Sequence, residues 1–273
     1  AAHVREKTAS ALNVVMLSCV LAMIVTPLGL GALLGWGATW RWILVGEAGF
    51  AAVLAVIFLA FPLRDIPDRE NLRARHVKEV FAYNPRLVAA MAVAGFLYSG
   101  AEGTLVTWLP KFEVDVFGAT GVWAGLAVTF YFVGQLVGRL ALRNVIRRFL
   151  PSTLLIGFAV VMATFVAATA VSPGQAASLA LTFVAGLGAS ASVSQIGRYA
   201  SQFPRWHAGV VFSAFQVAAG LGATAFPYVT GPVADGPGFR AAIAVAAIPA
   251  LILAVLALCL RRVSGETRAP VRL

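Results

Sequence analysis

The sequence predicts an all-α membrane protein, a bundle of eight transmembrane helices, and three observations support this prediction. Of the 273 residues, 60% are hydrophobic and only 12% are charged, whereas soluble domains contain about 25% charged residues. Apolar stretches long enough to cross a bilayer recur along the chain, without the alternating polarity of a membrane β-barrel. Basic residues gather in alternate connections between these stretches.

A helix needs roughly 20 apolar residues to cross the hydrocarbon core, because each residue advances it by about 1.5 Å. The stretches that meet this requirement are, in order, 11–35, 42–61, 87–109, 122–142, 151–171, 176–196, 208–229 and 241–260. Five of them contain no Asp, Glu, Lys or Arg, and the second, third and fourth contain one each: Glu47, Glu102 and Arg139. Each stretch is therefore predicted to be one membrane-spanning helix.

The distribution of basic residues predicts the orientation of the helices. Eighteen of the 21 Lys and Arg residues lie on one side, in both ends of the chain and in 62–86, 139–150 and 197–207. Cytoplasmic loops are rich in Lys and Arg, so we expect both ends of this chain in the cytoplasm. Because the charge is spread over short segments facing the membrane, the composition favours a lipid bilayer over nucleic acid as partner.

Two segments six predicted helices apart resemble each other. Residues 27–41, PLGLGALLGWGATWR, and residues 227–240, PYVTGPVADGPGFR, both begin with a proline at the outer end of a helix. Both continue through glycines and end with an aromatic residue followed by arginine. A duplicated six-helix unit predicts this spacing, and transporters are commonly built from such repeats. Pro27 and Pro227 are accordingly candidates for a structural or gating role.

Two motifs give a resemblance to a known family. Thr26–Pro27 followed by glycines and then TWRW at 39–42 is similar to the glycine-proline helix and outer turn of the major facilitator superfamily. GRLALRNVIRR at 138–148 is similar to the family's basic cytoplasmic loop, which makes Arg139 and Arg143 candidates for gating. The sequence departs from the family in Thr26, where a glycine is usual, and in Leu142, where an aspartate is usual.

Members of this superfamily have two six-helix halves joined by a cytoplasmic loop, and the resemblance implies how the chain is divided. Residues 1–61 would be the last two helices of the N-terminal half, and 62–86 the central cytoplasmic loop. Residues 87–262 would be the six-helix C-terminal half, and 263–273 a cytoplasmic tail. The chain would thus hold helices 5–12 of an expected twelve. The alternating charges of 62–86 suit a solvated, partly helical linker.

Within the superfamily, FLYSGAEGTLVTWLP (96–110) and residues 212–235 are most similar to the fucose-permease group of sugar-proton symporters. The resemblance implies a monomeric secondary transporter of the bacterial inner (plasma) membrane, without cofactor or metal. By alternating access it would move a small polar solute, with a sugar as the sharper prediction, together with protons. A drug or metabolite efflux antiporter is the main alternative, and a membrane-embedded enzyme or a non-transporting receptor is more remote. The chain lacks HExxH, GxSxG, P-loop and CxxC motifs, so no enzymatic chemistry is predicted.

Glu102 is the leading candidate for a site residue. An ionisable side chain inside a membrane helix costs at least about 2.5–3.5 kcal/mol and usually marks a functional site. Fifteen residues after Leu87, Glu102 is predicted to lie about 22 Å along a hydrocarbon core of roughly 30 Å. Tyr98 lies one turn earlier on the same face and can hydrogen-bond the carboxyl. We expect both to bind substrate or protons, the alternative being a structural acid near the outer end. Glu47, close to the boundary, is predicted to be structural.

Other polar side chains in the predicted helices can bind a hydroxylated solute or join helices to each other. Tyr131 and Gln135 share a face at i,i+4, Gln195 lies near the cytoplasmic end of the sixth stretch, and Gln216 lies in the seventh. A row of small residues at steps of four begins at Ser178, and it predicts either close helix packing or a polar cavity wall. Two GxxxG spacings, at Gly121–Gly125 and Gly134–Gly138, predict close packing.

Overall fold

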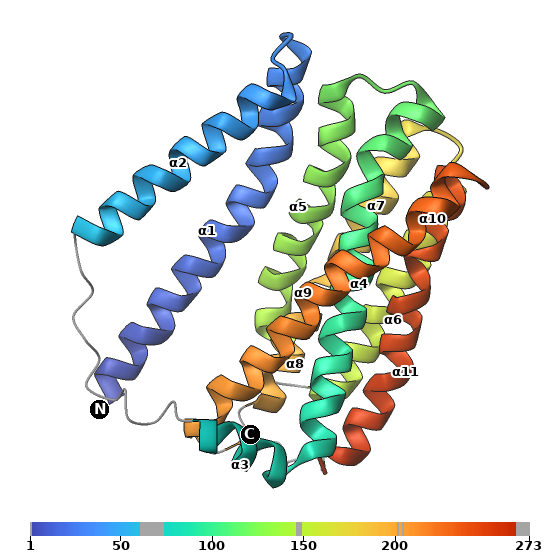
Figure 1. Ribbon diagram of the computed structural model, residues 1–273. Helices are drawn as coiled ribbons and strands as arrows, with labels where there is room; N and C mark the ends of the chain where they lie inside the picture. Colours follow the sequence, from blue (N-terminus) through green and yellow to red (C-terminus); the bar gives the residue numbers. More distant parts are fainter. Residues whose placement is uncertain (1, 61–73, 146–148, 201, 204, 266–273) are drawn as a thin grey trace.

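The computed structural model describes residues 2–60, 74–145, 149–200, 202–203 and 205–265, and all regular elements in this part are helices (Figure 1). They are α1 (Ala2–Gly35), α2 (Trp40–Ala60), α3 (Ala74–Tyr83), α4 (Pro85–Phe117), α5 (Gly121–Val145), α6 (Pro151–Ala170), α7 (Gln175–Ala189), α8 (Ser192–Ala200), α9 (Arg205–Asp235), α10 (Phe239–Val245) and α11 (Ala247–Val263). The predicted all-α fold class is confirmed.

Seven helical segments whose side chains the structure describes are long and apolar enough to cross a membrane. The remaining predicted stretch, 11–35, lies within α1, a helix of 34 residues whose described side chains begin at Cys19. Large apolar side chains cover the outside: Trp42, Phe50 and Leu59 of α2 are 73%, 67% and 82% exposed. Apolar surface on this scale matches a lipid environment.

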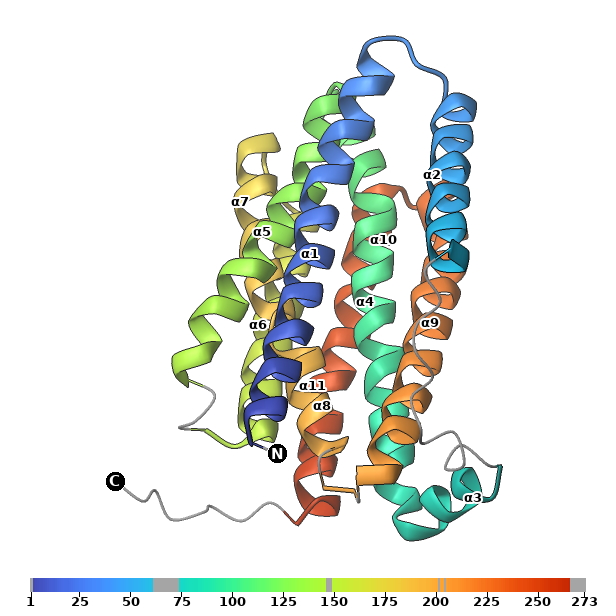
Figure 2. The same cartoon turned by 90° about the vertical axis from the view of Figure 1, so that its left-hand side faces the viewer.

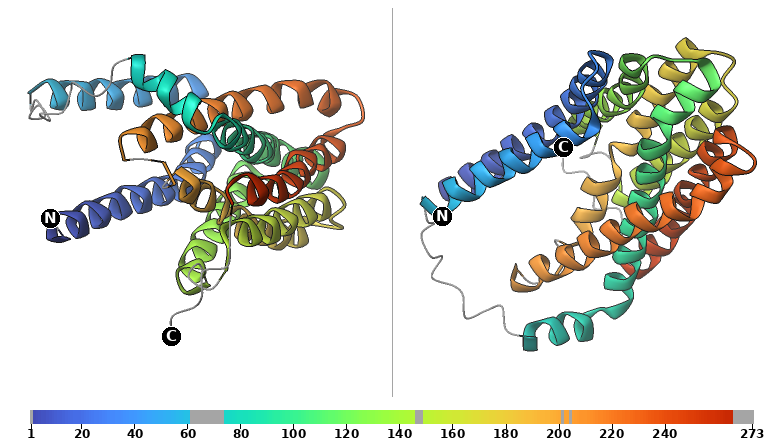
Figure 3. Two further views of the ribbon diagram at one scale, coloured as in Figure 1. Left: turned by 90° about the horizontal axis from the view of Figure 1, so that it is seen from below. Right: turned by 45° about the horizontal axis from the view of Figure 1, so that its top comes forward.

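The long helices run up and down in turn, as short connections between spanning helices require. α4, α6 and α9 run in one direction, and α5, α7 with α8, and α10 with α11 return (Figures 1 and 2). α1 packs against α5 of this group. α2 buries none of its residues and, with α1, lies on one side of the remaining helices (Figure 3). The short helix α3 occupies the described part of the segment 62–86, which was predicted to be partly helical.

α4 is longer than its predicted stretch, 87–109, and this changes the predicted depth of Glu102. Asn84 caps its start, where Oδ1 accepts a hydrogen bond from the Leu87 amide at 3.1 Å, and Gly118 ends it at a φ of 67°. The helix continues through Pro110, which membrane helices tolerate. Its 33 residues place Glu102 at the middle of the helix rather than towards one end.

Two predicted spans are interrupted, which the apolar pattern did not predict. Stretch 176–196 is divided into α7 and α8 at Ser190–Ala191, and stretch 241–260 into α10 and α11 at Ala246. At the first break, the Ser190 hydroxyl donates to the Leu187 carbonyl at 2.7 Å, and the Ser194 hydroxyl donates to the Ala191 carbonyl at 2.9 Å. The bent backbone is buried within the protein, where irregular structure is tolerated at membrane depth.

The GxxxG prediction is confirmed, because both pairs of glycines face neighbouring backbones. A Cβ added at Gly125 would meet the Pro27 carbonyl of α1 at 2.5 Å, so Pro27 lies at the contact between α1 and α5. A Cβ added at Gly134 would overlap the Phe183 carbonyl of α7, and one at Gly186 would overlap the Tyr131 carbonyl of α5. α5 and α7 therefore approach each other as closely as their backbones allow.

Candidate functional site

α4 and α5 bring together a chain of polar side chains at the middle of the bundle. The Gln135 amide nitrogen donates to Glu102 Oε1 at 2.5 Å and to the Tyr98 hydroxyl at 3.3 Å. Arg139, one turn further along α5, donates to Gln135 Oε1 at 2.6 Å. Tyr98 and Gln135 are buried, while Glu102 and Arg139 are partly exposed. We call these four residues the Glu102 network.

The chemistry of Arg139 fixes the orientation of the Gln135 amide. A guanidinium has only hydrogen-bond donors, so the amide oxygen of Gln135 must face it. The amide NH₂ group is then left to face the carboxyl of Glu102 and the hydroxyl of Tyr98. The Gln135 amide thus links the carboxyl of Glu102 to the positively charged Arg139. When Glu102 is ionised, Arg139 balances its charge, and when Glu102 is neutral, Gln135 remains its hydrogen-bond partner. The Glu102 network can therefore hold the acid in either form.

Tyr131 completes this polar region from α5. Its side chain is fully buried and lies one turn before Gln135 on the same face of α5. Its hydroxyl forms no hydrogen bond among the described residues. Five residues that were predicted from two separate helices thus lie in one region: Tyr98, Glu102, Tyr131, Gln135 and Arg139. Their role in binding remains a prediction.

The remaining predicted site residues lie elsewhere. Gln195 of α8 is buried and bonds to Ser194 and Arg198, at 3.3 and 3.0 Å, rather than to the Glu102 network. Gln216 is exposed on α9. Pro227 lies inside α9, and the side chain of Arg143 is outside the described part of the structure. Glu47 is exposed on α2, and its structural role stays a prediction.

Glu113 of α4 is a buried acid that the pattern of apolar stretches did not indicate. It has no exposed surface and accepts a hydrogen bond from the Ser178 hydroxyl of α7. Ser178 is the first member of the row of small residues, which was predicted to pack helices or to form a polar wall. The predicted stretch ends at residue 109, so Glu113 lies outside it, whereas α4 continues to Phe117. Continuing the helix through Pro110 would have revealed it.

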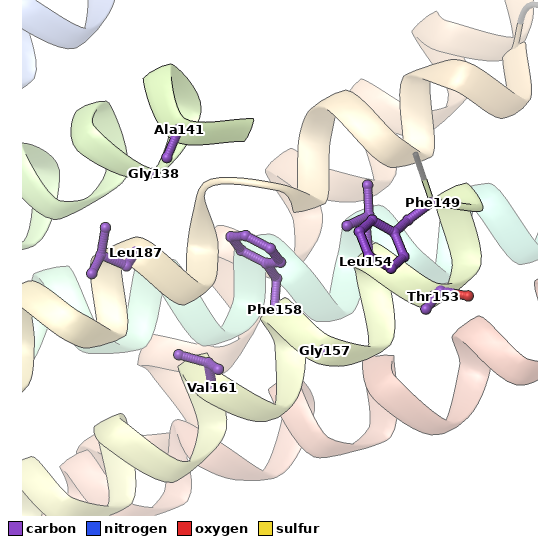
Figure 4. A pocket seen from close by; sticks show the side chains of 9 residues that line it. All are labelled: Gly138, Ala141, Phe149, Thr153, Leu154, Gly157, Phe158, Val161 and Leu187. Carbon is purple, nitrogen blue, oxygen red and sulfur yellow. The ribbon is translucent and has the colours of Figure 1, made fainter. Parts of the chain in front are cut away.

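A hollow of about 480 Å³ lies between α5, α6 and α7, and no residue of the Glu102 network lines it (Figure 4). Its lining is apolar except for one threonine, and consists of Gly138, Ala141, Phe149, Thr153, Leu154, Gly157, Phe158, Val161 and Leu187. A polar solute would find almost no hydrogen-bond partner there, so the hollow is not a candidate solute site.

Comparison with known proteins decides the family. The sequence profile of the Major Facilitator Superfamily matches residues 1–202 and also residues 114–272. The chain belongs to the Major Facilitator Superfamily. The resemblance inferred from the sequence motifs is thus confirmed, and the superfamily fold accounts for the antiparallel helices seen in Figure 1.

Solved structures with the superfamily fold are similar to this chain. The fucose:proton symporter of E. coli has a TM-score of 0.62 at 20% identity, over 79% of this chain and 53% of that one. A bacterial homologue of the human lysosomal transporter Spinster, inward-facing and unoccupied, has a TM-score of 0.72 at 14% identity, over 97% and 73%. At these identities the likeness concerns the fold. The chain spans about half the length of the fucose symporter.

A curated relative is similar over a shorter region. Multidrug resistance protein 3 of Bacillus subtilis (strain 168) is 28% identical over 102 residues, which are 37% of this chain and 19% of that protein. The match shows that part of this chain is related in sequence to that protein. Most of that protein is not covered by the match.

Replacing Gln135 with leucine is expected to destabilise this superfamily member by about 1–3 kcal/mol, because buried polar groups would lose their partner. The carboxyl of Glu102 and the guanidinium of Arg139 would both lose their hydrogen bonds to the amide. Unfolding of the purified protein in mixed detergent micelles measures the change. Gln216→Leu is the matched control, and since its amide is exposed, we expect a change within about 0.5 kcal/mol. Equal effects of the two substitutions would contradict the network.

Proposed function

We propose that this chain forms part of a secondary transporter that moves a small polar solute together with protons by alternating access. The Glu102 network is the observation that supports the proposal most directly. It places a partly exposed acid at the middle of a spanning helix, with an amide and a cation beside it. An ionisable residue at this depth is expensive unless it has a function. Superfamily membership supports rocking of two helical halves about such a midplane site.

In this proposal Glu102 is the proton carrier and the polar side chains around it bind the solute. Neutral Glu102 retains its hydrogen bond from Gln135, and ionised Glu102 is balanced by Arg139 through the same amide. A solute hydroxyl can donate to the carboxyl or exchange hydrogen bonds with the Tyr98 and Tyr131 hydroxyls. Binding and protonation thus share one set of groups, which is the requirement for coupling them.

A sugar is the solute class that we favour. A carboxyl, an amide and two phenols offer several donors and acceptors within a small space, which suits a compact molecule with many hydroxyl groups. The fold likeness to a fucose:proton symporter agrees with this choice. Three further predictions belong to the same proposal. The arginine-rich side faces the cytoplasm, the protein lies in the bacterial inner membrane, and residues 62–86 divide the two halves.

Solute uptake into membrane vesicles tests this function. The vesicles are made from cells that produce the protein from its complete gene. We expect a proton gradient to drive accumulation of L-fucose or another member of a monosaccharide panel, and a protonophore to abolish it. Vesicles from cells without the gene are the control. Absence of gradient-driven uptake across the whole panel would contradict sugar-proton symport.

An efflux antiporter for drug-like compounds is the second candidate, because part of the chain is kin to multidrug resistance protein 3. The same cells distinguish the two functions. Deletion of the gene would raise the intracellular level of a fluorescent amphiphile such as ethidium if the protein exports drugs. It would leave that level unchanged and reduce monosaccharide uptake if the protein is a symporter.

A further inference from the structure

Glu113 forms a second polar site in the interior of the bundle, about three turns along α4 from Glu102. One carboxyl oxygen, Oε1, accepts the hydrogen bond from Ser178 that joins α4 to α7. The other, Oε2, is buried and has no hydrogen-bond partner among the described residues. The site lies towards the end of α4 marked by Gly118, which we call the Gly118 end.

The face of α7 that carries Ser178 holds two further polar groups of the same kind. Gln175, Ser178 and Thr182 are three and four residues apart and share one face of the helix. The amide nitrogen of Gln175 and the hydroxyl of Thr182 are buried and, within the described part of the chain, form no hydrogen bond. Two polar atoms beside Ser178 on this face of α7 therefore have unused hydrogen-bonding capacity.

The charged groups near the contact between α4 and α7 have other partners or are exposed. The Arg240 guanidinium of α10 lies over the ring of Phe112, 5.9 Å from its centroid, and donates to two backbone carbonyls at and just after the end of α6, while Lys111 pairs with Asp115 at 3.2 Å. Asp235 of α9 is exposed. α6 and α7 contain no charged residue, and the charged residues of α5 lie at its other end. Among the described residues, none forms an ion pair with Glu113.

We propose that Glu113 is a second proton-binding site, whose proton holds α4 against α7 at the Gly118 end. A buried carboxylate without a counter-charge is costly, so the burial of Glu113 beside Ser178 of α7 favours the neutral acid. The neutral acid still accepts from Ser178 through one oxygen, and its other oxygen carries no charge, so it costs less to bury than a carboxylate oxygen. Loss of the proton favours separation of α4 and α7, which admits water to the carboxylate. The site is separate from the Glu102 network, so it does not depend on proton coupling at Glu102.

Accessibility of a buried cysteine tests the proposal in the full-length protein. Thr182→Cys is a suitable reporter, because Thr182 is fully buried and its hydroxyl has no partner to lose. Val171→Cys, at a position 77% exposed, corrects for the intrinsic rise of thiol reactivity with pH. Both are made in a chain whose native cysteines, Cys19 and Cys259, are replaced by alanine, and are labelled with a water-soluble thiol reagent.

The ratio of labelling at position 182 to that at 171 is expected to rise with pH. For release of one proton, the open fraction grows by up to about tenfold per pH unit. Glu113→Gln, which keeps the shape but cannot ionise, should flatten this rise, and Glu102→Gln should leave it intact. A ratio that does not change with pH, or one that rises equally in Glu113→Gln, would overturn the proposal. Either result would leave the proposed transport function untouched, which the uptake assay judges separately.

Discussion

Replacing Glu102 with glutamine is expected to abolish accumulation of the solute against its gradient. Glutamine has nearly the same shape and can still bond to Gln135, whose amide nitrogen lies 2.5 Å from Glu102 Oε1 in the native protein. An amide cannot release a proton, however, so every step that needs net proton movement stops. Exchange of labelled for unlabelled solute, which needs no net proton transfer, should continue. We expect accumulation to fall to the level of vesicles without the protein, as measured by uptake of the solute identified in the monosaccharide panel.

Glu47→Gln is the matched control for this substitution. Glu47 also lies in a spanning helix, but it is exposed on α2, away from the Glu102 network. We expect its replacement to leave accumulation unchanged. Accumulation by Glu102→Gln at the rate of the native protein would exclude Glu102 from coupling, while equal losses in both variants would point to a general effect of removing acids.

Adding a single methyl group at Gly186 is expected to destabilise the protein by about 2–3 kcal/mol, since overpacking at a close contact forces the backbones apart. The Cβ of alanine at this position would overlap the Tyr131 carbonyl of α5. Separation of α5 from α7 would also displace Tyr131 and Gln135, and so the Glu102 network. Unfolding in mixed detergent micelles measures the stability, and solute uptake measures the effect on the site.

Gly157→Ala in α6 provides the comparison, because a Cβ there meets nothing within 4 Å. Alanine favours helix over glycine, so we expect this variant to be as stable as the native protein or up to about 1 kcal/mol more stable. If Gly186→Ala proved equally harmless, the close approach of α5 and α7 would be wrong.

The sequence predicted the family, the helical fold and the individual polar residues from local pattern. Glu102 stood out because its neighbours are apolar, and Tyr98 and Gln135 followed from spacings along single helices. The hydrogen bond between Gln135 and Glu102 could not be predicted in the same way. It depends on how α4 and α5 are rotated about their axes, which is decided by packing across the bundle.

Errors in the predicted helices have a common physical origin. Hydropathy reports where apolar residues lie, but not where the backbone bends or continues. The break at Ser190–Ala191 lies within an apolar stretch and is stabilised by serine side chains, so composition did not mark it. Conversely, the predicted stretch 87–109 ends where α4 continues through Pro110, and Glu113 lies in the added part. Gln195 and Gln216 were reasonable candidates by depth, but their helices present them away from Glu102.

Proton movement caused by the solute tests the central claim, that Glu102 couples proton and solute, most directly. The solute is added to de-energised vesicles in weakly buffered medium, and the external pH is followed with an electrode. We predict that the medium becomes alkaline with the native protein, as protons enter with the solute, and that it does not change with Glu102→Gln. Alkalinisation of equal size with both proteins would contradict the assignment of Glu102 as the coupling acid.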